Sequence, residues 1–313
     1  MKVLVTGACG FIGTNLCESL LNDGHEVIGL DDFSGKYPLR AFKKNSLVLK
    51  HKKGKFIKAS VLDREKILSL SKKSITHIVH LAAKAGVRDS VLFPKKYLET
   101  NIVGTQNILD LALAAKIKHV VLASTSSVYG TNKPPFRETM HIDTPLSVYA
   151  ASKVGMEALA YSYYNIHSLP ITVLRFFTVY GSRGRRDMSV YKFAKLISEA
   201  KKIHVYGNGN QKRDFTYVAD IVQGIRSAMK LGKGYNTFNL GCSTTVKLNY
   251  MIGLLEKNIG KKAVKKHEKA RPEDPIETHA DISKARRELG FEPKTKIEKG
   301  IALFCKWFRE NPD

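Results

Sequence analysis

The sequence predicts an α/β protein, with a doubly wound parallel sheet joined to a smaller C-terminal α/β lobe. In the first half, short apolar runs rich in β-branched residues alternate with longer helical patterns. This alternation is typical of βαβ units, in which helices cover both faces of a parallel sheet. After Gly181, glycine-rich turns with short strands and helices replace it. We expect residues 1–180 to form the sheet domain, with later segments returning to it, and residues 181–313 to form mainly the smaller lobe.

The individual elements are predicted from apolar runs and from their end signals. Short apolar runs predict strands at residues 2–6, 26–30, 55–59, 77–82, 119–124 and 171–177. Helical patterns predict helices at residues 11–23, 63–72, 94–115, 145–168, 218–230 and 282–289. Gly24 is expected to end the first helix, and Asp63 is expected to be the N-cap of the second.

The composition excludes several classes of protein. The 313 residues, 43% of them hydrophobic, suffice for a packed core. No run of about 18 uncharged apolar residues is present and the N-terminal apolar run is too short for a signal peptide, so we expect no membrane partner. The four cysteines have neither metal-ligand spacing nor disulfide-rich density. We therefore expect free thiols, no metal site and a cytoplasmic location.

The charge is strongly positive. Lys and Arg number 52 against 28 Asp and Glu, a net charge of +24. This balance raises the question of nucleic-acid binding, but no DNA- or RNA-binding motif accompanies it. We expect solvated lysines and no specific nucleic-acid partner, with a positive field that concentrates anionic substrates. Two clusters stand out: Lys43, Lys44, Lys50, Lys52, Lys53 and Lys55, and Lys257, Lys261, Lys262, Lys265 and Lys266.

A glycine-rich turn follows the first predicted strand. Gly7, Gly10 and Gly13 have the spacing Gly-x-x-Gly-x-x-Gly, and Phe11 and Ile12 open the following helix. Glycines permit a tight turn and let backbone N–H groups approach a pyrophosphate at a helix N-terminus. Because the turn lies between a strand and a helix, we interpret it as a dinucleotide-binding turn.

Two carboxylates end the second predicted strand. Asp31, followed by Asp32, lies about 20 residues beyond the glycines, where a carboxylate accepts hydrogen bonds from an adenosine ribose. A negative charge there repels the 2′-phosphate of NADP, so the sequence favours NAD. The alternative is an Asp that only caps a turn, and Lys36 and Arg40 lie close enough in the sequence to weaken the preference for NAD.

A tyrosine and a lysine four residues apart form the candidate catalytic pair. Tyr149 and Lys153 lie in the predicted helix 145–168, so both side chains project from one face. An ammonium beside a phenol favours the phenolate, so Lys153 is expected to lower the Tyr149 pKa from about 10 and make a general base. The spacing alone also fits a half-buried tyrosine beside a surface lysine. Thr125, at the end of the strand 119–124, supplies a hydroxyl at the edge where such sheets bind ligands.

Taken together, these motifs resemble the extended short-chain dehydrogenase/reductase family of NAD-dependent epimerases and dehydratases. The matching segments, in order along nearly the whole chain, are residues 6–13, 80–83, 101–105 and 124–130, Tyr149 with Lys153, and residues 213–215. The resemblance implies a Rossmann-type domain that binds NAD and a smaller lobe that binds a UDP-sugar. It implies that Thr125, Tyr149 and Lys153 are catalytic, that Leu81, Ala82, Ala83 and Asn101 contact NAD, and that the protein is a homodimer.

The residues after Thr125 distinguish reactions within this family. Its nucleotide-sugar 4,6-dehydratases carry an Asp-Glu pair, and its UDP-glucuronate decarboxylases a Glu, where this chain has Ser126 and Ser127. Carboxylates supply the acid and base for elimination of water, which two hydroxyls do not supply at neutral pH. An epimerase needs only removal and return of a hydride, so the serines favour epimerisation.

An arginine-rich loop points to the substrate. Residues 174–188, together with Arg88 in the segment 85–88, resemble the branch of the family that acts on UDP-glucuronate, although Ser182 and Arg186 replace the usual prolines. We select Arg185 to bind the uronate carboxylate, because a guanidinium binds a carboxylate by two hydrogen bonds, with Thr178 as a hydroxyl partner. The alternative is a solvated basic loop.

The resemblance also suggests residues for the nucleotide end of the substrate. Arg213 and Arg271 match phosphate-contacting positions, and Asp274 matches a uridine-ribose contact. Either arginine alternatively forms a structural ion pair. Residues 59–61 lack the acidic residue that the family often places near adenine.

The predicted reaction is reversible C4 epimerisation of UDP-glucuronate to UDP-galacturonate. Tyr149 takes the C4 hydroxyl proton, directly or through Thr125, hydride transfer to NAD gives a 4-keto sugar, and hydride returns to its other face. Epimerisation of UDP-glucose or UDP-N-acetylglucosamine is the first alternative. Decarboxylation of UDP-glucuronate and a non-catalytic NAD-binding role are the others.

Overall fold

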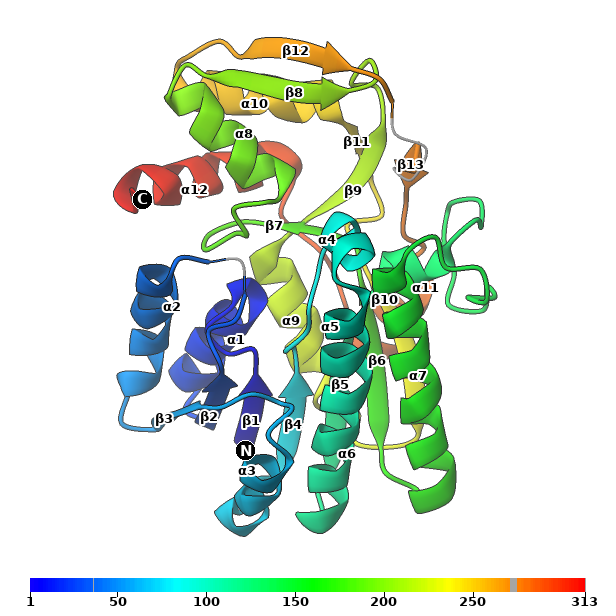
Figure 1. Cartoon of the computed structure of the whole chain (residues 1–313). Helices are drawn as coiled ribbons and strands as arrows, with labels where there is room; N and C mark the ends of the chain where they lie inside the picture. Colours follow the sequence, from blue (N-terminus) through cyan, green and yellow to red (C-terminus); the bar gives the residue numbers. More distant parts are fainter. Residues whose placement is uncertain (36, 271–274, 313) are drawn as a thin grey trace.

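The main layer is a seven-stranded parallel sheet. The computed structural model describes residues 1–35, 37–270 and 275–312. The strand order is β10-β6-β5-β4-β1-β2-β3, and each neighbouring pair is parallel (Figure 1). The strands are β1 (Lys2–Thr6), β2 (Glu26–Asp31), β3 (Gly54–Lys58), β4 (His77–His80), β5 (His119–Thr125), β6 (Ile171–Phe176) and β10 (Tyr235–Leu240).

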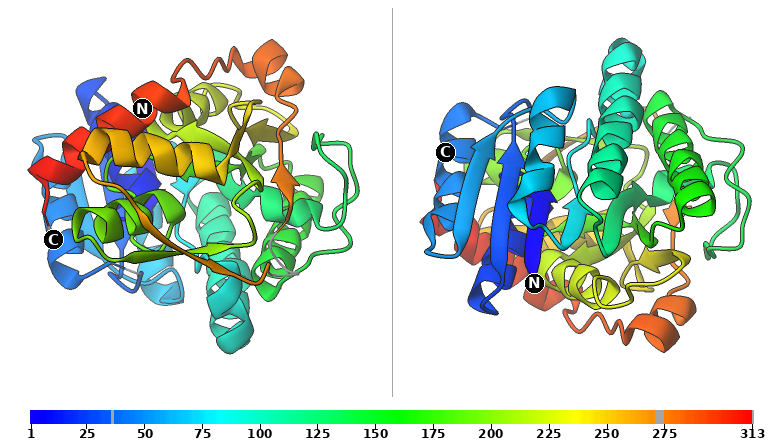
Figure 2. Two further views of the ribbon diagram at one scale, coloured as in Figure 1. Left: turned by 90° about the horizontal axis from the view of Figure 1, so that it is seen from above. Right: turned by 90° about the horizontal axis from the view of Figure 1, so that it is seen from below.

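Helices cover both faces of this sheet, which confirms the predicted doubly wound α/β fold (Figure 2). Side chains alternate along β1, so Val3 and Val5 pack on one face while Leu4 packs on the other. The first face is covered by α1 (Phe11–Asn22), α9 (Val218–Ala228) and α11 (Ser283–Leu289). The second is covered by α3 (Arg64–Ser69), α6 (Gly104–Ala114) and α7 (Val148–His167).

The strand order places the candidate site. From β1 the chain first adds β2 and β3 on one side and then β4, β5, β6 and β10 on the other. The order therefore reverses between β1 and β4. In open α/β sheets, ligands bind beyond the carboxyl ends of the strands at this reversal.

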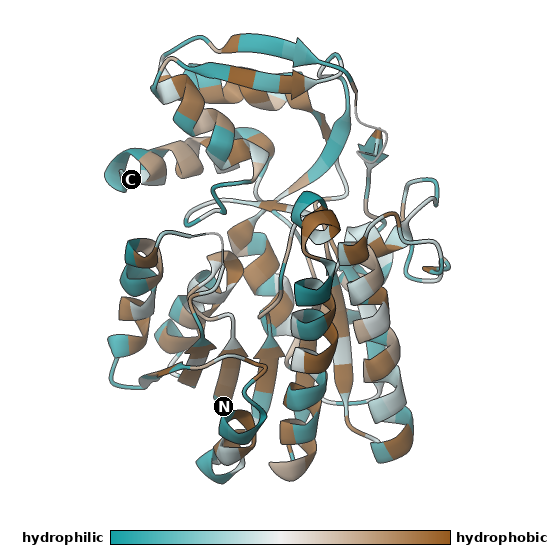
Figure 3. Cartoon of the chain, in the orientation of Figure 1, coloured by the Kyte–Doolittle hydropathy of each residue, from teal (hydrophilic) through white to brown (hydrophobic). Residues whose placement is uncertain are grey.

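The smaller lobe lies over that carboxyl edge (Figure 1). Its core joins Tyr191, Ile252 and Phe304 with other buried apolar residues. Figure 3 shows apolar residues along the inner strands of the main sheet, whereas strand β12 at the outer rim is largely hydrophilic. The lobe contains β7 (Thr178–Tyr180), α8 (Ser189–Ser198), β8 (Lys202–Tyr206), β9 (Lys212–Tyr217), β11 (Thr245–Lys247), α10 (Leu248–Ile259), β12 (Val264–Glu268), β13 (Glu277–Thr278) and α12 (Ile297–Glu310).

Three elements beyond residue 181 lie with the main sheet. Strand β10 extends its edge beside β6, and α9 and α11 cover one face. Phe238, Leu240 and Phe291 share an apolar cluster with residues of β1 and α1.

Several element boundaries differ from the prediction for local reasons. Helix α7 begins at Val148, not at residue 145, because the Ser147 hydroxyl accepts a hydrogen bond from Ala150 N and caps the helix. The helix predicted at 94–115 is divided into α5 (Pro94–Leu98), a π-helical turn (Glu99–Val103) and α6. Such turns are frequent at functional sites.

The remaining short helices connect these layers. They are α2 (Leu39–Ser46), α4 (Val87–Leu92) and the 3-10 helices η1 (Leu47–Lys50), η2 (Leu70–Lys73) and η4 (Ser126–Tyr129). Within the described part of the chain, no helix has both the length and the apolar character that crossing a membrane requires.

Candidate active site

The glycine turn joins β1 to α1 at the carboxyl edge. Gly7 has a φ of +67°, and a Cβ there would lie 2.8 Å from Ala82 N. A Cβ on Gly13 would overlap the Gly7 carbonyl oxygen, so α1 packs directly on the turn. Neither position accommodates a side chain without movement of the backbone.

The N-terminus of α1 opens onto the same edge. Gly10 is its N-cap, and Phe11 and Ile12 begin its first turn. The first N–H groups of a helix lack partners within it and favour an anion. This arrangement fits a pyrophosphate at the helix N-terminus.

Asp31 ties the end of β2 to the glycine turn. Its Oδ2 accepts a hydrogen bond from Cys9 N at 3.0 Å, and its Oδ1 accepts one from Phe33 N at 2.8 Å. Burial raises the Asp31 pKa, and these two backbone donors oppose that effect. Asp31 therefore organises the turn, and further lone pairs on its carboxylate are compatible with the predicted ribose contact.

Asp32 instead caps the next turn. Its Oδ1 accepts hydrogen bonds from Ser34 N at 2.9 Å and from the Ser34 hydroxyl. Lys84 Nζ donates to the Ser34 carbonyl at 2.9 Å and links this turn to the segment after β4. The exposed Asp32 thus caps this turn.

The segment after β4, which contains Leu81, Ala82 and Ala83, lies against the glycine turn. Leu81 N donates to the Thr6 carbonyl at 3.2 Å, and Ala82 N donates to Thr6 Oγ1 at 3.2 Å. Ala83 follows directly in the chain, and all three residues are partly exposed.

The π-helical turn presents Asn101 to this region. Asn101 Oδ1 accepts from Lys84 N at 2.8 Å, and Asn101 Nδ2 donates to the Lys84 carbonyl at 3.0 Å and to Ser152 Oγ at 2.8 Å. Asn101 therefore connects the segment after β4 to α7. In this structure it orders the backbone around the predicted cofactor site.

The three predicted catalytic residues come together at the carboxyl end of β5. The Thr125 hydroxyl lies near the half-buried Tyr149 side chain and is one of the groups that lower its pKa. Lys153 is 3% exposed, and its Nζ donates to the Ala123 carbonyl at 2.7 Å. Burial lowers the Lys153 pKa to about 8, against the opposing charge of Glu157.

The expected effect of Lys153 on Tyr149 is wrong for this structure. Burial raises the Tyr149 pKa, while the Thr125 hydrogen bond and the Arg185 charge lower it in part. The Lys153 ammonium is directed to the Ala123 carbonyl instead, so it does not produce the predicted depression. The depressing charge comes from Arg185, 36 positions beyond Tyr149, which helix spacing cannot reveal.

Ser126 and Ser127 lie in η4 directly after Thr125. Ser127 N donates to Thr125 Oγ1 at 3.2 Å, and Thr125 Oγ1 lies 3.3 Å from Ser127 Oγ. Both serines are partly exposed. The turn therefore offers three adjacent hydroxyls at the point where a dehydratase has carboxylates.

Arg185 reaches the catalytic centre but already binds a carboxylate. Its Nε donates to Asp187 Oδ1 at 3.0 Å, and its Nη2 donates to Asp187 Oδ2 at 2.6 Å. Nη2 also donates to the Ala85 carbonyl at 3.2 Å. Asp187 was absent from the predicted site, although its position two residues after Arg185 is a visible signal.

The neighbouring arginines have other contacts. Arg183 binds Glu18 of α1 through both terminal nitrogens, at 2.7 and 3.2 Å. The Arg186 guanidinium lies over the Tyr191 ring at 5.8 Å. Arg183 thus connects the loop to the sheet domain.

The structure describes three of the other predicted substrate residues, Thr178, Arg88 and Arg213. Thr178 and Arg185 line one cavity together with Phe11. Arg88 lies over the Tyr206 ring at 5.2 Å, and Arg213 Nη1 donates to the Lys212 carbonyl at 2.9 Å. Arg271 and Asp274 lie outside the described residues.

The chain belongs to the extended short-chain dehydrogenase/reductase family of epimerases and dehydratases. The sequence profile of the GDP-mannose 4,6 dehydratase family matches residues 4–304. The resemblance carried by the motifs is thereby confirmed.

Characterised relatives lie within this family. The chain is 42% identical to a UDP-glucuronate 4-epimerase of Thermodesulfobacterium geofontis, over 98% of this chain and 96% of that protein. The structure of UDP-glucuronic acid 4-epimerase from Bacillus cereus with UDP-glucuronic acid and NAD has a TM-score of 0.94 at 35% identity, with 99% of each chain covered. UDP-glucose 4-epimerase from Thermotoga maritima with UDP-glucose has a TM-score of 0.90 at 30% identity, again with 99% of each chain covered.

The buried lysine predicts a specific dependence of stability on pH. The Lys153 pKa is about 8 in the folded protein, against 10.5 ordinarily. Between these values the unfolded chain binds a proton that the folded chain does not, so the free energy of unfolding rises with pH. Urea denaturation from pH 7 to 10.5 should show wild type gaining about 3 kcal/mol relative to Lys153→Met. Lys72→Met, at an exposed position, is the control, and identical pH dependence in the two variants would contradict this assignment.

Proposed function

We propose that the protein is an NAD-dependent UDP-glucuronate 4-epimerase. The observation that carries this proposal is the contact between Thr125 and Tyr149 beside buried Lys153, with Ser126 and Ser127 where elimination chemistry needs carboxylates. Sugar oxidation requires a base at the hydroxyl, and epimerisation requires no second acid–base pair. The relatives named UDP-glucuronate 4-epimerase support the same reaction.

The residues of the glycine turn fit NAD. Gly7 and Gly13 allow close backbone approach, the α1 N-terminus faces the expected pyrophosphate, and Asp31 disfavours a 2′-phosphate. When bound, NAD supplies the acceptance and return of hydride. We assign its binding to Gly7, Gly10, Phe11, Ile12, Gly13, Asp31, Asp32, Leu81, Ala82, Ala83, Asn101, Tyr149 and Lys153.

Residues of this chain transfer the proton of the C4 hydroxyl. Tyr149 accepts the proton of the C4 hydroxyl, with Thr125 relaying or orienting it, and later returns it. Because burial raises the Tyr149 pKa, the Arg185 charge and the Thr125 hydrogen bond are needed to favour the phenolate. Lys153 adds positive charge at the nicotinamide ribose.

We assign the uronate carboxylate to Arg185, with Thr178 as hydroxyl partner. A ketone at C4 is β to the C6 carboxylate, and such an acid loses CO2 readily. Fixing the carboxylate keeps the C–CO2 bond out of alignment with the carbonyl π system. We assign the other contacts with the sugar to Ser126, Ser127 and Arg88. We assign the contacts with the nucleotide to Arg213, Arg271 and Asp274.

Epimerisation of a neutral UDP-sugar is the second candidate. Asp187 occupies the Nε–Nη2 edge of the Arg185 guanidinium, so a substrate carboxylate must displace it or share the arginine. A neutral UDP-sugar requires neither displacement of Asp187 nor sharing of Arg185. The similarity to a UDP-glucose 4-epimerase agrees with this alternative.

We further propose a cytoplasmic homodimer formed through α7 and the helical segment that runs from α5 through the π-helical turn to α6. Leu98, Val103 and Tyr161 on these elements are apolar or aromatic and 43%, 45% and 54% exposed, and exposed apolar groups of this kind mark interaction surfaces. Cys9, Cys17, Cys242 and Cys305 are free thiols, as suits a reducing compartment.

Incubation with UDP-glucuronate tests the reaction. We expect UDP-galacturonate, resolved by chromatography, and a loss of about 10²- to 10⁴-fold in kcat for Tyr149→Phe with NAD still bound. A UDP-pentose product indicates decarboxylation instead. Turnover of UDP-glucose without turnover of UDP-glucuronate rejects the uronate assignment, and undiminished Tyr149→Phe activity rejects the base.

The role of Arg185 has a matched control on its own loop. Arg185→Ala should lower kcat/KM for UDP-glucuronate by about 10- to 100-fold, the loss of a charge-assisted contact. UDP-glucose turnover should fall by less, because that sugar loses only the Arg185 charge that favours the Tyr149 phenolate. Arg186→Ala, whose guanidinium lies over Tyr191, should affect both sugars equally. Equal losses for both sugars in Arg185→Ala would contradict the carboxylate role.

The dimer proposal is tested by mass in solution. Light scattering after gel filtration should give a dimer for wild type and a monomer for the double variant Leu98→Lys with Val103→Lys, because two buried charges oppose association. Leu303→Lys, on α12 and 40% exposed in wild type, should remain dimeric. A monomeric mass for the wild-type protein would contradict the dimer proposal.

A further inference from the structure

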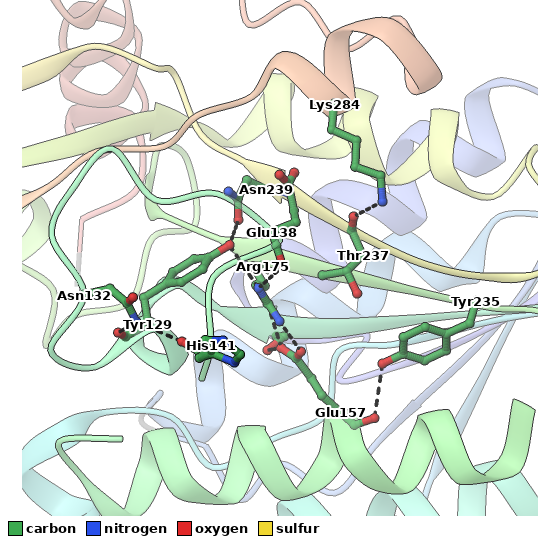
Figure 4. A network of polar contacts seen from close by, with 11 residues as sticks. Tyr129, Asn132, Glu138, His141, Glu157, Arg175, Tyr235, Thr237, Asn239 and Lys284 are labelled. Carbon is green, nitrogen blue, oxygen red and sulfur yellow. Dashed lines mark hydrogen bonds and ion pairs between the residues drawn. The ribbon is translucent and has the colours of Figure 1, made fainter. Parts of the chain in front are cut away.

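A buried ion pair lies beside the catalytic residues. Arg175 of β6 donates from Nη2 to Glu157 Oε2 at 2.7 Å and from Nε to Oε1 at 3.1 Å, and both side chains are 5% exposed (Figure 4). Isolated buried pairs contribute little net stability, because desolvation offsets their attraction. The pair therefore calls for an explanation other than stability.

Glu157 fixes α7 to the strand that carries Thr125. The Ser124 hydroxyl donates to Glu157 Oε1 at 2.5 Å. Lys153, four residues earlier on the same face of α7, donates to the adjacent Ala123 carbonyl at 2.7 Å. Two buried side chains of α7 thus contact consecutive residues of β5, immediately before Thr125 contacts Tyr149.

Arg175 also contacts the segment that follows Thr125. Its Nη1 donates to Tyr129 Oη at 3.1 Å and to the Glu138 carbonyl at 3.4 Å. The Tyr129 hydroxyl in turn donates to Asn239 Oδ1 at 2.6 Å (Figure 4). Tyr129 ends the 3-10 helix that begins at Ser126. One guanidinium therefore contacts both α7 and the segment that follows Thr125.

The groups around Lys153 also affect its protonation. Buried Lys153 lies within electrostatic range of His80 and Glu157, and Arg175 is paired with the Glu157 carboxylate. Burial and the Lys153 charge lower the His80 pKa to about 3, so that imidazole stays neutral. Burial also opposes charge on Lys153, and the Glu157 carboxylate favours it.

We propose that Glu157 is a positioning residue for catalysis: held by Arg175 and Ser124, it fixes α7 on β5 and keeps Lys153 positively charged. This role rests on the proposed epimerase function. Glu157 acts through Lys153 and is separated from the substrate by it. Its loss should therefore lower kcat while leaving KM for UDP-glucuronate nearly unchanged.

The test is the pH profile of kcat for Glu157→Gln with bound NAD. The amide keeps the size of the side chain but removes its charge, so Lys153 loses its proton at lower pH. We expect the alkaline limb to move down by about one pH unit, and kcat at pH 8 to fall about fivefold relative to wild type. Glu157→Asp, which keeps the charge, should retain the wild-type limb even where its thermal midpoint is lower.

Asp214→Asn is the matched control. Asp214 is also fully buried and accepts backbone hydrogen bonds from Cys242 and Ser243 in the smaller lobe. Its variant should lower the thermal midpoint without moving the alkaline limb. A folded, NAD-loaded Glu157→Gln with an unmoved limb overturns the proposal, as do identical limbs in the Gln and Asp variants. Absence of wild-type turnover instead rejects the epimerase function itself.

Discussion

Burial of the Lys153 ammonium between α7 and the end of β5 is the constraint on which the site depends. A buried ammonium needs acceptors and a nearby negative charge, and here the Ala123 carbonyl and Glu157 meet that need. The Glu157 carboxylate lies about one helical turn after Lys153 on α7, and the Ala123 carbonyl lies near the end of β5. Satisfying the lysine therefore also sets the separation of α7 and β5, and with it the contact between Tyr149 and Thr125.

The main sheet forms the second half of the site, where backbone segments again approach one another closely. Its strand order reverses between β1 and β4, which leaves a crevice at the carboxyl edge. Gly7 and Gly13 let the turn, α1 and the end of β4 meet without intervening side chains. Asp31 then holds that turn through Cys9 N.

The loop after β7 couples the two parts of the molecule. Arg183 binds Glu18 on α1, and the Tyr37 hydroxyl donates to the Arg183 carbonyl at 3.0 Å. Two residues later Arg185 lies within electrostatic reach of Tyr149. The loop to which we assign sugar selection is therefore anchored to α1, the helix at the proposed NAD site.

The sequence by itself determined the α/β fold, the glycine turn and the proposed catalytic residues, because these depend on local periodicity and fixed spacing. Strand alternation, Gly7 to Gly13, and the step from Tyr149 to Lys153 are all readable within short windows. Only the tertiary structure decided the electrostatics. It directed Lys153 to Ala123, placed the Arg185 charge near Tyr149, paired Arg185 with Asp187, and joined Glu157 to Arg175 across α7 and β6. Burial and the charges contributed by other elements set each pKa, and neither is encoded in the spacing of residues along one helix.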